Sequence, residues 1–335
     1  MKITMLGTSG SGKTVFSAGI FATFTRREYE GFSIWAPGAN FSDVIRDTHK
    51  FEKDYRMLAQ HKWPHGTAGI SHYQLELLYK GEKKANFDWI DYRGGFLDEP
   101  TLDSEQTSEV HANIAASNAV ILFADAQKLV ESSNPDEAAF NSGADAIMQI
   151  LMGYARDYPD TKLTFLIALT KCDAIPREWK VKNYDRLVKH GIRTFEPLKD
   201  IIQRNENWRG GIIPTSTMGD GNVNSDGDIT GFPKPFNIAS IIAFCTGSIL
   251  RHDQEDINDH IKQIESKKDE IEDKYMGFFG AIKKTFNIFN GSKTDNEVLK
   301  DLRREMEEDY NRLQSISQVV ERLEEMAEYK VGMLT

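Results

Sequence analysis

The stretch Gly7-Thr8-Ser9-Gly10-Ser11-Gly12-Lys13-Thr14 decides the fold expected for the first part of this chain. It matches G-x-x-x-x-G-K-[ST], the pattern of a phosphate-binding loop, between a short apolar run at Lys2–Leu6 and a helical pattern at Thr14–Ala22. A glycine-rich turn lets several backbone N–H groups converge on one anion, and the N-terminus of the following helix adds the positive end of its dipole. The sequence therefore predicts a strand, a phosphate site and a helix, in that order.

Two side chains of this loop have distinct expected roles. Lys13 is expected to reach the β- and γ-phosphates of a nucleotide, and the hydroxyl of Thr14 is expected to bind Mg²⁺. The other phosphate contacts are expected from Gly7, Ser9, Gly10, Ser11 and Gly12. A chance glycine-rich turn is the alternative, and the matching strand and helix on either side argue against it.

Composition restricts the class of protein. The 335 residues carry a net charge of -10, which disfavours a general role in binding nucleic acid, because phosphate backbones attract basic surfaces. Only two cysteines occur, so we expect a reducing, cytoplasmic setting without disulfides. The phosphate-binding pattern begins close to Met1, so no signal peptide is expected. No apolar run approaches the roughly 20 residues that span a bilayer.

Apolar strand-like runs alternate with helical patterns over residues 1–250. This alternation is typical of a three-layer α/β domain with a mostly parallel sheet, and we expect the fold of a P-loop NTPase. Tyr73–Tyr79 and Asn86–Asp91 lie too close in sequence for a parallel crossover, so they are expected to pair as an antiparallel hairpin. Other strands are expected at Gly31–Trp35, Asn118–Asp125, Leu163–Leu169 and Gly211–Pro214, and helices at Phe41–Gln60, Pro135–Ala155 and Phe236–Leu250.

The composition changes after about Leu250. Residues 251–335 are rich in charge, with apolar residues three and four positions apart, so we expect a coiled-coil-like antiparallel helical hairpin. Its expected tip, residues 276–291, is apolar and basic without an acidic residue. Three interpretations of the tip stay open: packing onto its own domain, docking on a partner, and contact with a membrane surface by a peripheral protein. The helices themselves are expected to bind a protein partner or a second copy of the chain.

Asp91-Tyr92-Arg93-Gly94 ends the second strand of the predicted hairpin. An Asp leaving a strand can hold Mg²⁺, commonly through water, and the N–H of the glycine after it can turn onto a γ-phosphate. A threonine just before the hairpin can complete the Mg²⁺ shell. We favour Thr67 over Thr48 for this role, because Thr48 lies within a predicted helix.

Thr170-Lys171-Cys172-Asp173 follows a buried strand. The carboxylate of Asp173 is expected to accept hydrogen bonds from N1–H and N2–H₂ of guanine, which adenine cannot supply. Lys171 is expected to lie along the base, and Thr170 to belong to the same site. After the next strand, Ser216 and Thr217 are expected to offer backbone N–H groups to the guanine O6.

In order, these motifs resemble those of the Ras-like GTPases of the translation-factor-related class, over roughly residues 1–250. The segments Trp63–Thr67 and Trp89–Gly95 are also similar to the bacterial double-GTPase families linked to conflict and defence systems. The resemblance implies GTP and GDP as ligands, Mg²⁺ as the metal and GTP hydrolysis as the activity. It assigns nucleotide and metal roles to Lys13, Thr14, Thr67, Asp91, Lys171 and Asp173.

One departure from these families concerns hydrolysis. Ras-like enzymes often carry a water-orienting Gln directly after the D-x-x-G glycine, whereas this chain has Gly95 there. We therefore expect slow or partner-stimulated hydrolysis, with Lys13, Thr67 and Gly94 at the reacting phosphate and Arg93 as a candidate charge stabiliser. The alternative is a nucleotide-gated scaffold, or a partner- or membrane-binding module, that barely hydrolyses GTP. An ATP-driven enzyme is disfavoured by Asp173.

Overall fold

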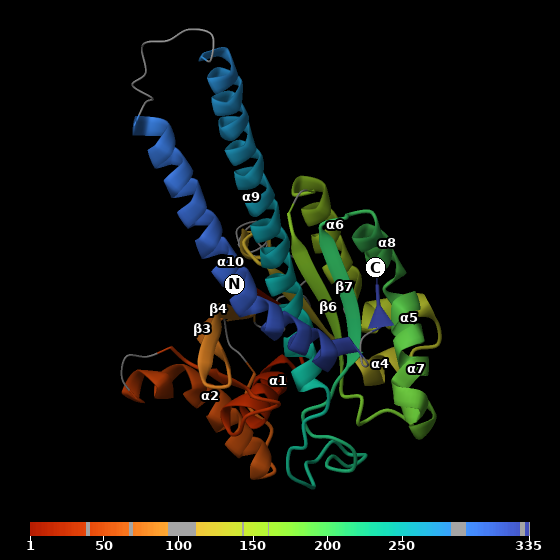
Figure 1. Cartoon of the computed structure of the whole chain (residues 1–335). Helices are drawn as coiled ribbons and strands as arrows, with labels where there is room; N and C mark the ends of the chain where they lie inside the picture. The colour runs from red at the N-terminus through yellow and green to blue at the C-terminus, as the bar shows by residue number, and fades with distance from the viewer. Residues whose placement is uncertain are drawn as a thin grey trace. The chain divides into compact units, whose positions relative to one another are not determined.

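The computed structural model describes residues 1–37, 41–66, 70–92, 112–142, 144–159, 161–282, 293–328 and 332–334 (Figure 1). The chain divides into two compact units, one of Met1–Ile249 with Leu323–Thr335 and the other of Leu250–Arg322. The division near residue 250 lies where the composition changes. The last residues belong to the first unit, whereas the sequence pattern assigned all of residues 251–335 to the helical extension.

The first unit is built on an eight-stranded mixed sheet in the order β2-β3-β4-β1-β5-β6-β7-β8. Adjacent strands within β4-β1-β5-β6-β7 are parallel, whereas the pairs β2–β3, β3–β4 and β7–β8 are antiparallel. The predicted hairpin is confirmed, because β3 and β4 are antiparallel neighbours. The strands are β1 (Lys2–Gly7), β2 (Phe32–Trp35), β3 (Ser71–Tyr79), β4 (Glu82–Asp91), β5 (Ala119–Asp125), β6 (Leu163–Thr170), β7 (Trp208–Pro214) and β8 (Gly332–Met333).

Helices lie on both faces of this sheet. On one face Phe16 of α1 contacts Phe123 of β5 edge to face, with ring centroids 5.0 Å apart. Because side chains alternate along a strand, Leu122 points to the other face and joins a core made with the helices α4 to α8. The helices are α1 (Lys13–Ile20), which continues as the π-helix η1 (Phe21–Thr25), α2 (Phe41–Ala59), α4 (Ala126–Glu131), α5 (Pro135–Ser142), α6 (Ala144–Asp157), α7 (Arg177–Thr194), α8 (Glu196–Gln203), α9 (Ile238–Ile282) and α10 (Lys293–Glu328).

Several elements differ from the sequence-based expectation. The predicted helix at Pro135–Ala155 is two helices, α5 and α6. The predicted closing helix does not end at Leu250, since α9 continues without a break into the second unit. The helices α7 and α8 and the short strand β8 were not predicted. In α7, Lys182, Asn183 and Tyr184 have positive φ angles, so the helix is interrupted there.

The second unit pairs α9 with α10. Gln254 Nε2 donates to Ser317 Oγ at 2.9 Å, and His260 Nδ1 lies 2.7 Å from Asp309 Oδ2. A later residue of α9 therefore contacts an earlier residue of α10. The two helices are antiparallel, as expected for a helical hairpin. Its buried apolar residues include Ile257, Ile261, Ile264, Ile316, Val319 and Val320. The apolar tip, residues 276–291, lies outside the residues whose side chains the structure describes.

The helices of the described residues are too short or too polar to span a membrane.

Candidate functional site

The loop between β1 and α1 has the backbone that a phosphate-binding turn requires. Gly10 and Gly12 adopt positive φ angles of 73° and 94°, a region that side chains with a Cβ enter only with strain. A Cβ on Gly7 would lie 2.8 Å from the carbonyl oxygen of Phe123, so the loop passes close against β5. Glycine is needed at these positions for two separate reasons, conformation at Gly12 and close packing at Gly7.

Lys13 folds back over the loop that precedes it. Its ammonium group donates to the carbonyl oxygens of Gly7 at 2.6 Å and Thr8 at 3.1 Å, and the residue is only 6% exposed. A buried ammonium requires such partners, because burial without them is costly. The amine is thus held at the rim of the turn, within the set of groups that would meet an anion.

Thr170 connects this loop to the ends of two strands. Its hydroxyl lies 2.7 Å from the carbonyl oxygen of Ser11 and 3.1 Å from that of Ala124. Ser11 belongs to the phosphate-binding loop, and Ala124 to β5. The threonine that opens the T-K-x-D motif therefore positions the glycine-rich loop against β5 and β6.

Lys171 forms an ion pair that the sequence did not predict. Its Nζ lies 2.5 Å from Oδ2 of Asp125, which ends β5 and is 4% exposed. The other oxygen of Asp125 accepts from the backbone N–H of Gln127 at 2.9 Å and so caps α4. The sequence signal for this cap was present, since Asp125 stands between a buried strand and a helix. The ion pair holds the Lys171 stem across the strand ends.

Asp173 is partly buried beside Ser216. Burial raises the pKa of its carboxyl group, while a hydrogen bond from Ser216 opposes that change. Its backbone oxygen accepts from Nζ of Lys180 at 2.5 Å. Ser216 and Lys180 therefore hold Asp173 in place on the segment after β6, Ser216 through the carboxyl group of Asp173 and Lys180 through its backbone oxygen.

The turn after β7 differs from the expected arrangement. The backbone N–H of Ser216 donates to the carbonyl oxygen of Phe236 at 3.2 Å, so this amide is already used within the fold. The Ser216 hydroxyl accepts from the N–H of Gly219 and contacts Asp173 instead. Thr217 is tied to α1, because its hydroxyl donates to the carbonyl oxygen of Val15 at 3.0 Å. Ser216 thus supports Asp173 through its side chain rather than offering its N–H.

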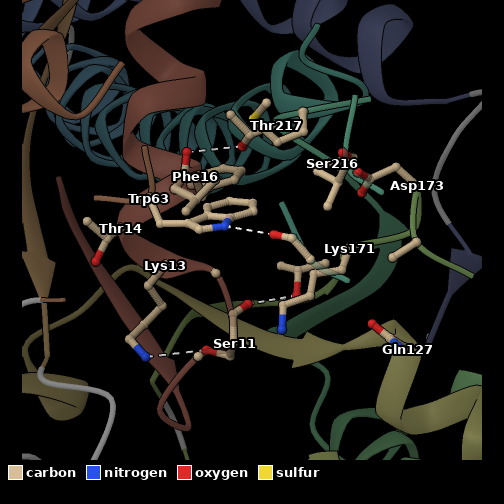
Figure 2. Close-up of a pocket in the computed structure, with 18 of the residues that line it drawn as sticks. Ser11, Lys13, Thr14, Phe16, Trp63, Gln127, Lys171, Asp173, Ser216 and Thr217 are labelled. Carbon is tan, nitrogen blue, oxygen red and sulfur yellow. Dashed lines mark hydrogen bonds between the residues drawn. The ribbon is translucent and has the colours of Figure 1, made fainter. Parts of the chain in front are cut away.

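Most of the predicted site residues line one pocket of about 880 Å³, whereas Gly7 does not (Figure 2). In the view of Figure 2, Lys13 and Thr14 lie at one end, and Asp173 and Ser216 lie at the other. The predicted site residues that line it are Ser9, Gly10, Ser11, Gly12, Lys13, Thr14, Thr170, Lys171, Asp173, Ser216 and Thr217. Lining residues that the sequence reasoning missed include Trp63, Tyr92, Gln127, Asn224 and Gly227. The pocket brings together segments that lie far apart in sequence, from Ser9 to Gly227.

A pair of buried carboxylates lies close to the strand end next to β1. Asp91 ends β4 beside Met5 of β1 and is 2% exposed. Asp54 of α2 is 5% exposed, and its Oδ2 has no hydrogen-bond partner in the described part of the chain. Burial raises the pKa of Asp54 to about 6, with the negative charge of Asp91 adding to the effect and Lys50 opposing it. The sequence signal for Asp54 was an acidic residue on the buried face of a helix.

Several predicted residues lie outside the described residues. They are Thr67, Arg93 and Gly94, together with Gly95. The structure also does not describe the side chain of Thr48, the rival of Thr67, whose backbone lies in α2. The predicted switch contacts of these residues therefore stay predictions.

Comparison with known proteins does not identify a family for this chain. No protein-family model matches the chain, and a search of curated proteins finds no significant match.

Proposed function

We propose that this chain binds guanine nucleotides with Mg²⁺ and hydrolyses GTP as a conformational switch. The observation that carries the proposal is one pocket lined by both the glycine-rich loop and the T-K-x-D segment. The fold class agrees with it, since the site lies at the carboxyl ends of parallel strands β1 and β6, where α/β proteins bind ligands. Assignment to a Ras-like fold is part of the same proposal.

The loop and the helix behind it supply what a chain of phosphates needs. The positive φ angles of Gly10 and Gly12 turn the backbone sharply before α1, whose N-terminus has no side-chain cap. Uncapped N–H groups and the helix dipole favour an anion there. Lys13 already lies within reach of the loop carbonyls and would exchange those contacts for phosphate oxygens. This part of the site accounts for phosphate binding but not for the choice of base.

Asp173 supports guanine over adenine. Its carboxylate is an acceptor only, which fits the N1–H and N2–H₂ donors on the edge of guanine. Adenine presents an unprotonated N1 at that position, so a buried carboxylate facing it would lose its hydrogen bonds. The support from Ser216 and the ion pair that holds Lys171 give this end of the pocket a fixed arrangement.

The residues near the phosphate end fit a magnesium ion. Oxygen atoms are the ligands Mg²⁺ prefers, and Thr14 and Asp91 would supply a hydroxyl and a carboxylate. Asp54, one oxygen of which has no hydrogen-bond partner among the described residues, adds a further acidic group close to Asp91. When bound, the ion would neutralise charge on the β- and γ-phosphates. Thr67 and Gly94 would then contact the γ-phosphate and lose that contact after hydrolysis. The resulting conformational change would pass to a partner through α9 and α10.

The second candidate function is a nucleotide-gated scaffold with little hydrolysis. The sequence observation that favours it is Gly95, which has no side chain to orient a water molecule. Single-turnover GTP hydrolysis separates the two candidates. The proposed enzyme consumes GTP slowly, and Lys13→Ala abolishes turnover whereas the surface variant Lys267→Ala does not. A wild-type protein that binds GTP but leaves it intact, alone and with added partners, supports the scaffold instead.

Base recognition is tested by nucleotide titration. Wild type is expected to bind GDP far more tightly than ADP, and Asp173→Asn is expected to lose that preference. The amide of the variant can donate to the extra carbonyl of xanthine, so the variant should gain affinity for xanthosine diphosphate. Equal binding of ADP and GDP by the wild type would contradict the guanine assignment.

A further inference from the structure

The pocket has a wall that the nucleotide motifs do not include, made by Trp63 and the turn Val223–Gly227. The helix α2 ends at Ala59, His61 just after it has a φ of 60°, and the N–H of Lys62 donates to the carbonyl oxygen of Met57 at 2.9 Å. This left-handed ending turns the chain sharply toward Trp63. The ring of His61 lies 6.3 Å from that of Phe232, so the turn is also packed against the segment after β7. Trp63 thus reaches the pocket from a defined helix end.

The opposite part of this wall is the turn Val223–Gly227. All residues of this turn except Asp226 line the pocket. The side chain of Asn224 holds the turn closed, because its Oδ1 accepts from the N–H groups of Asp226 at 3.0 Å and Asp228 at 2.8 Å. The carbonyl oxygen of Gly227 remains available to an outside donor. A turn closed by its own hydrogen bonds presents that oxygen in a fixed place.

Trp63 and this turn are joined by a hydrogen bond. The indole Nε1 donates to the carbonyl oxygen of Gly227 at 2.9 Å (Figure 2). The indole satisfies its only donor in this way, yet Trp63 is still 44% exposed while lining the pocket. A large aromatic ring that is anchored at its polar edge and nearly half exposed offers an apolar surface to a flat ligand.

We propose that the purine base of the nucleotide stacks on the indole of Trp63, and that the Trp63–Gly227 hydrogen bond holds the ring in place as a clasp over the base. This inference rests on the proposed nucleotide function. It adds a contact made through the aromatic face, which every purine has, to the edge contact made by Asp173. The clasp therefore contributes to affinity and slows release, whereas Asp173 chooses the base.

The location of Trp63 also gives the clasp a connection to the phosphates. Only three residues separate it from Thr67, the residue expected to sense the γ-phosphate. Loss of the γ-phosphate would act on the same connection between α2 and β3 that carries the clasp. Release of the base is then expected to be faster for GDP than for GTP.

The test compares three ligands on matched variants. Wild type, Trp63→Leu and Trp63→Phe are titrated with GDP, GTP and tripolyphosphate, which has phosphates but no base. Trp63→Leu is expected to bind GDP about 5- to 150-fold more weakly, the range typical of losing one base–aromatic stack, and tripolyphosphate as tightly as wild type. Trp63→Phe keeps a ring without the N–H, so it is expected to retain most of the GDP affinity and to release GDP faster.

Trp35 supplies the matched control. It is 39% exposed, ends β2 and does not line the pocket, so Trp35→Phe is expected to leave all three affinities and rates unchanged. GDP is also expected to change the indole fluorescence of wild type and Trp35→Phe but not of Trp63→Phe. Unchanged GDP affinity in Trp63→Leu would overturn the clasp and leave the nucleotide function standing. A wild type that binds tripolyphosphate but no nucleotide would overturn both.

Discussion

Replacement of Asp54 by asparagine removes a buried carboxylate while keeping its shape. Asp54 lies on the inner face of α2, 5% exposed, with one oxygen that no described residue satisfies. Ionised Asp91 lies near enough to disfavour a second negative charge, although Lys50, Lys53 and His65 act in the opposite direction. In the absence of a bound cation, ionised Asp54 is therefore a cost to the folded state.

The size of that cost follows from the shift in the pKa of Asp54. Burial raises this pKa from 3.8 to about 6 in the folded protein. A shift of about two units, at about 1.36 kcal/mol per unit, corresponds to about 3 kcal/mol of folding free energy. Because the folded pKa is the higher one, the contribution of the neutral carboxyl group is fully present below about pH 4 and is lost as the pH rises through about 6.

Urea unfolding without Mg²⁺ measures this difference. At pH 8, Asp54→Asn is expected to be more stable than wild type by up to about 3 kcal/mol. The advantage is expected to shrink by about 1.4 kcal/mol when the pH is lowered from 8 to 5, because Asp54 then takes up its proton in the folded state. Asp200→Asn, at an exposed position of α8, serves as the control and is expected to show no such change.

Two results would refute the reasoning about Asp54. One is a stability difference between Asp54→Asn and wild type that is the same at both pH values. The other is a difference that grows as the pH falls, which would mean that the ionised carboxylate is stabilised by its surroundings. Either result would also remove Asp54 from the acidic group beside Asp91.

Three further changes test other parts of the structure. Thr170→Val removes the hydroxyl that lies within hydrogen-bond distance of the carbonyl oxygens of Ser11 and Ala124 and is expected to cost about 1–3 kcal/mol in urea unfolding, whereas Thr170→Ser should stay near wild type. Gly12→Ala forces a Cβ into a left-handed backbone and is expected to cost about 1–2 kcal/mol and to abolish tripolyphosphate binding in calorimetry. Gly81→Ala carries the same strain in the β3–β4 turn and should cost stability alone, so equal phosphate binding by both variants would contradict the role of the loop. Ile264→Ala is expected to cost about 2–5 kcal/mol in the unfolding of the helical unit, and a value no larger than that of exposed Lys267→Ala would show that α9 and α10 do not bury it.

Much of the first unit could be predicted because its signals are local. Strands β1, β5 and β6 are mostly apolar runs, and an apolar run between turn residues has few alternatives to a buried strand. The glycine-rich loop and the T-K-x-D segment each follow one of these strands. Parallel strands end at the same edge of a sheet, so the sequence already implied that the two motifs would meet.

The helices α7 and α8 could not be predicted in the same way. The α7 sequence is rich in charged residues and contains three consecutive residues with positive φ angles, so no continuous apolar stripe marks it. Leu187 of α7 and Leu198 and Ile202 of α8 are buried only because the sheet lies beneath them. Packing of this kind overrides a weak local pattern.

The sequence alone determined which residues would approach a phosphate chain and a base, because glycine geometry and the ends of strands are local properties. Tertiary structure alone decided how those residues are held. Lys171 pairs with Asp125 from a different strand, and the amide of Ser216 is taken by Phe236 from a later segment. Trp63 likewise meets Gly227 across 164 positions. Contacts of this length depend on which strands become neighbours, and no short stretch of sequence contains that information.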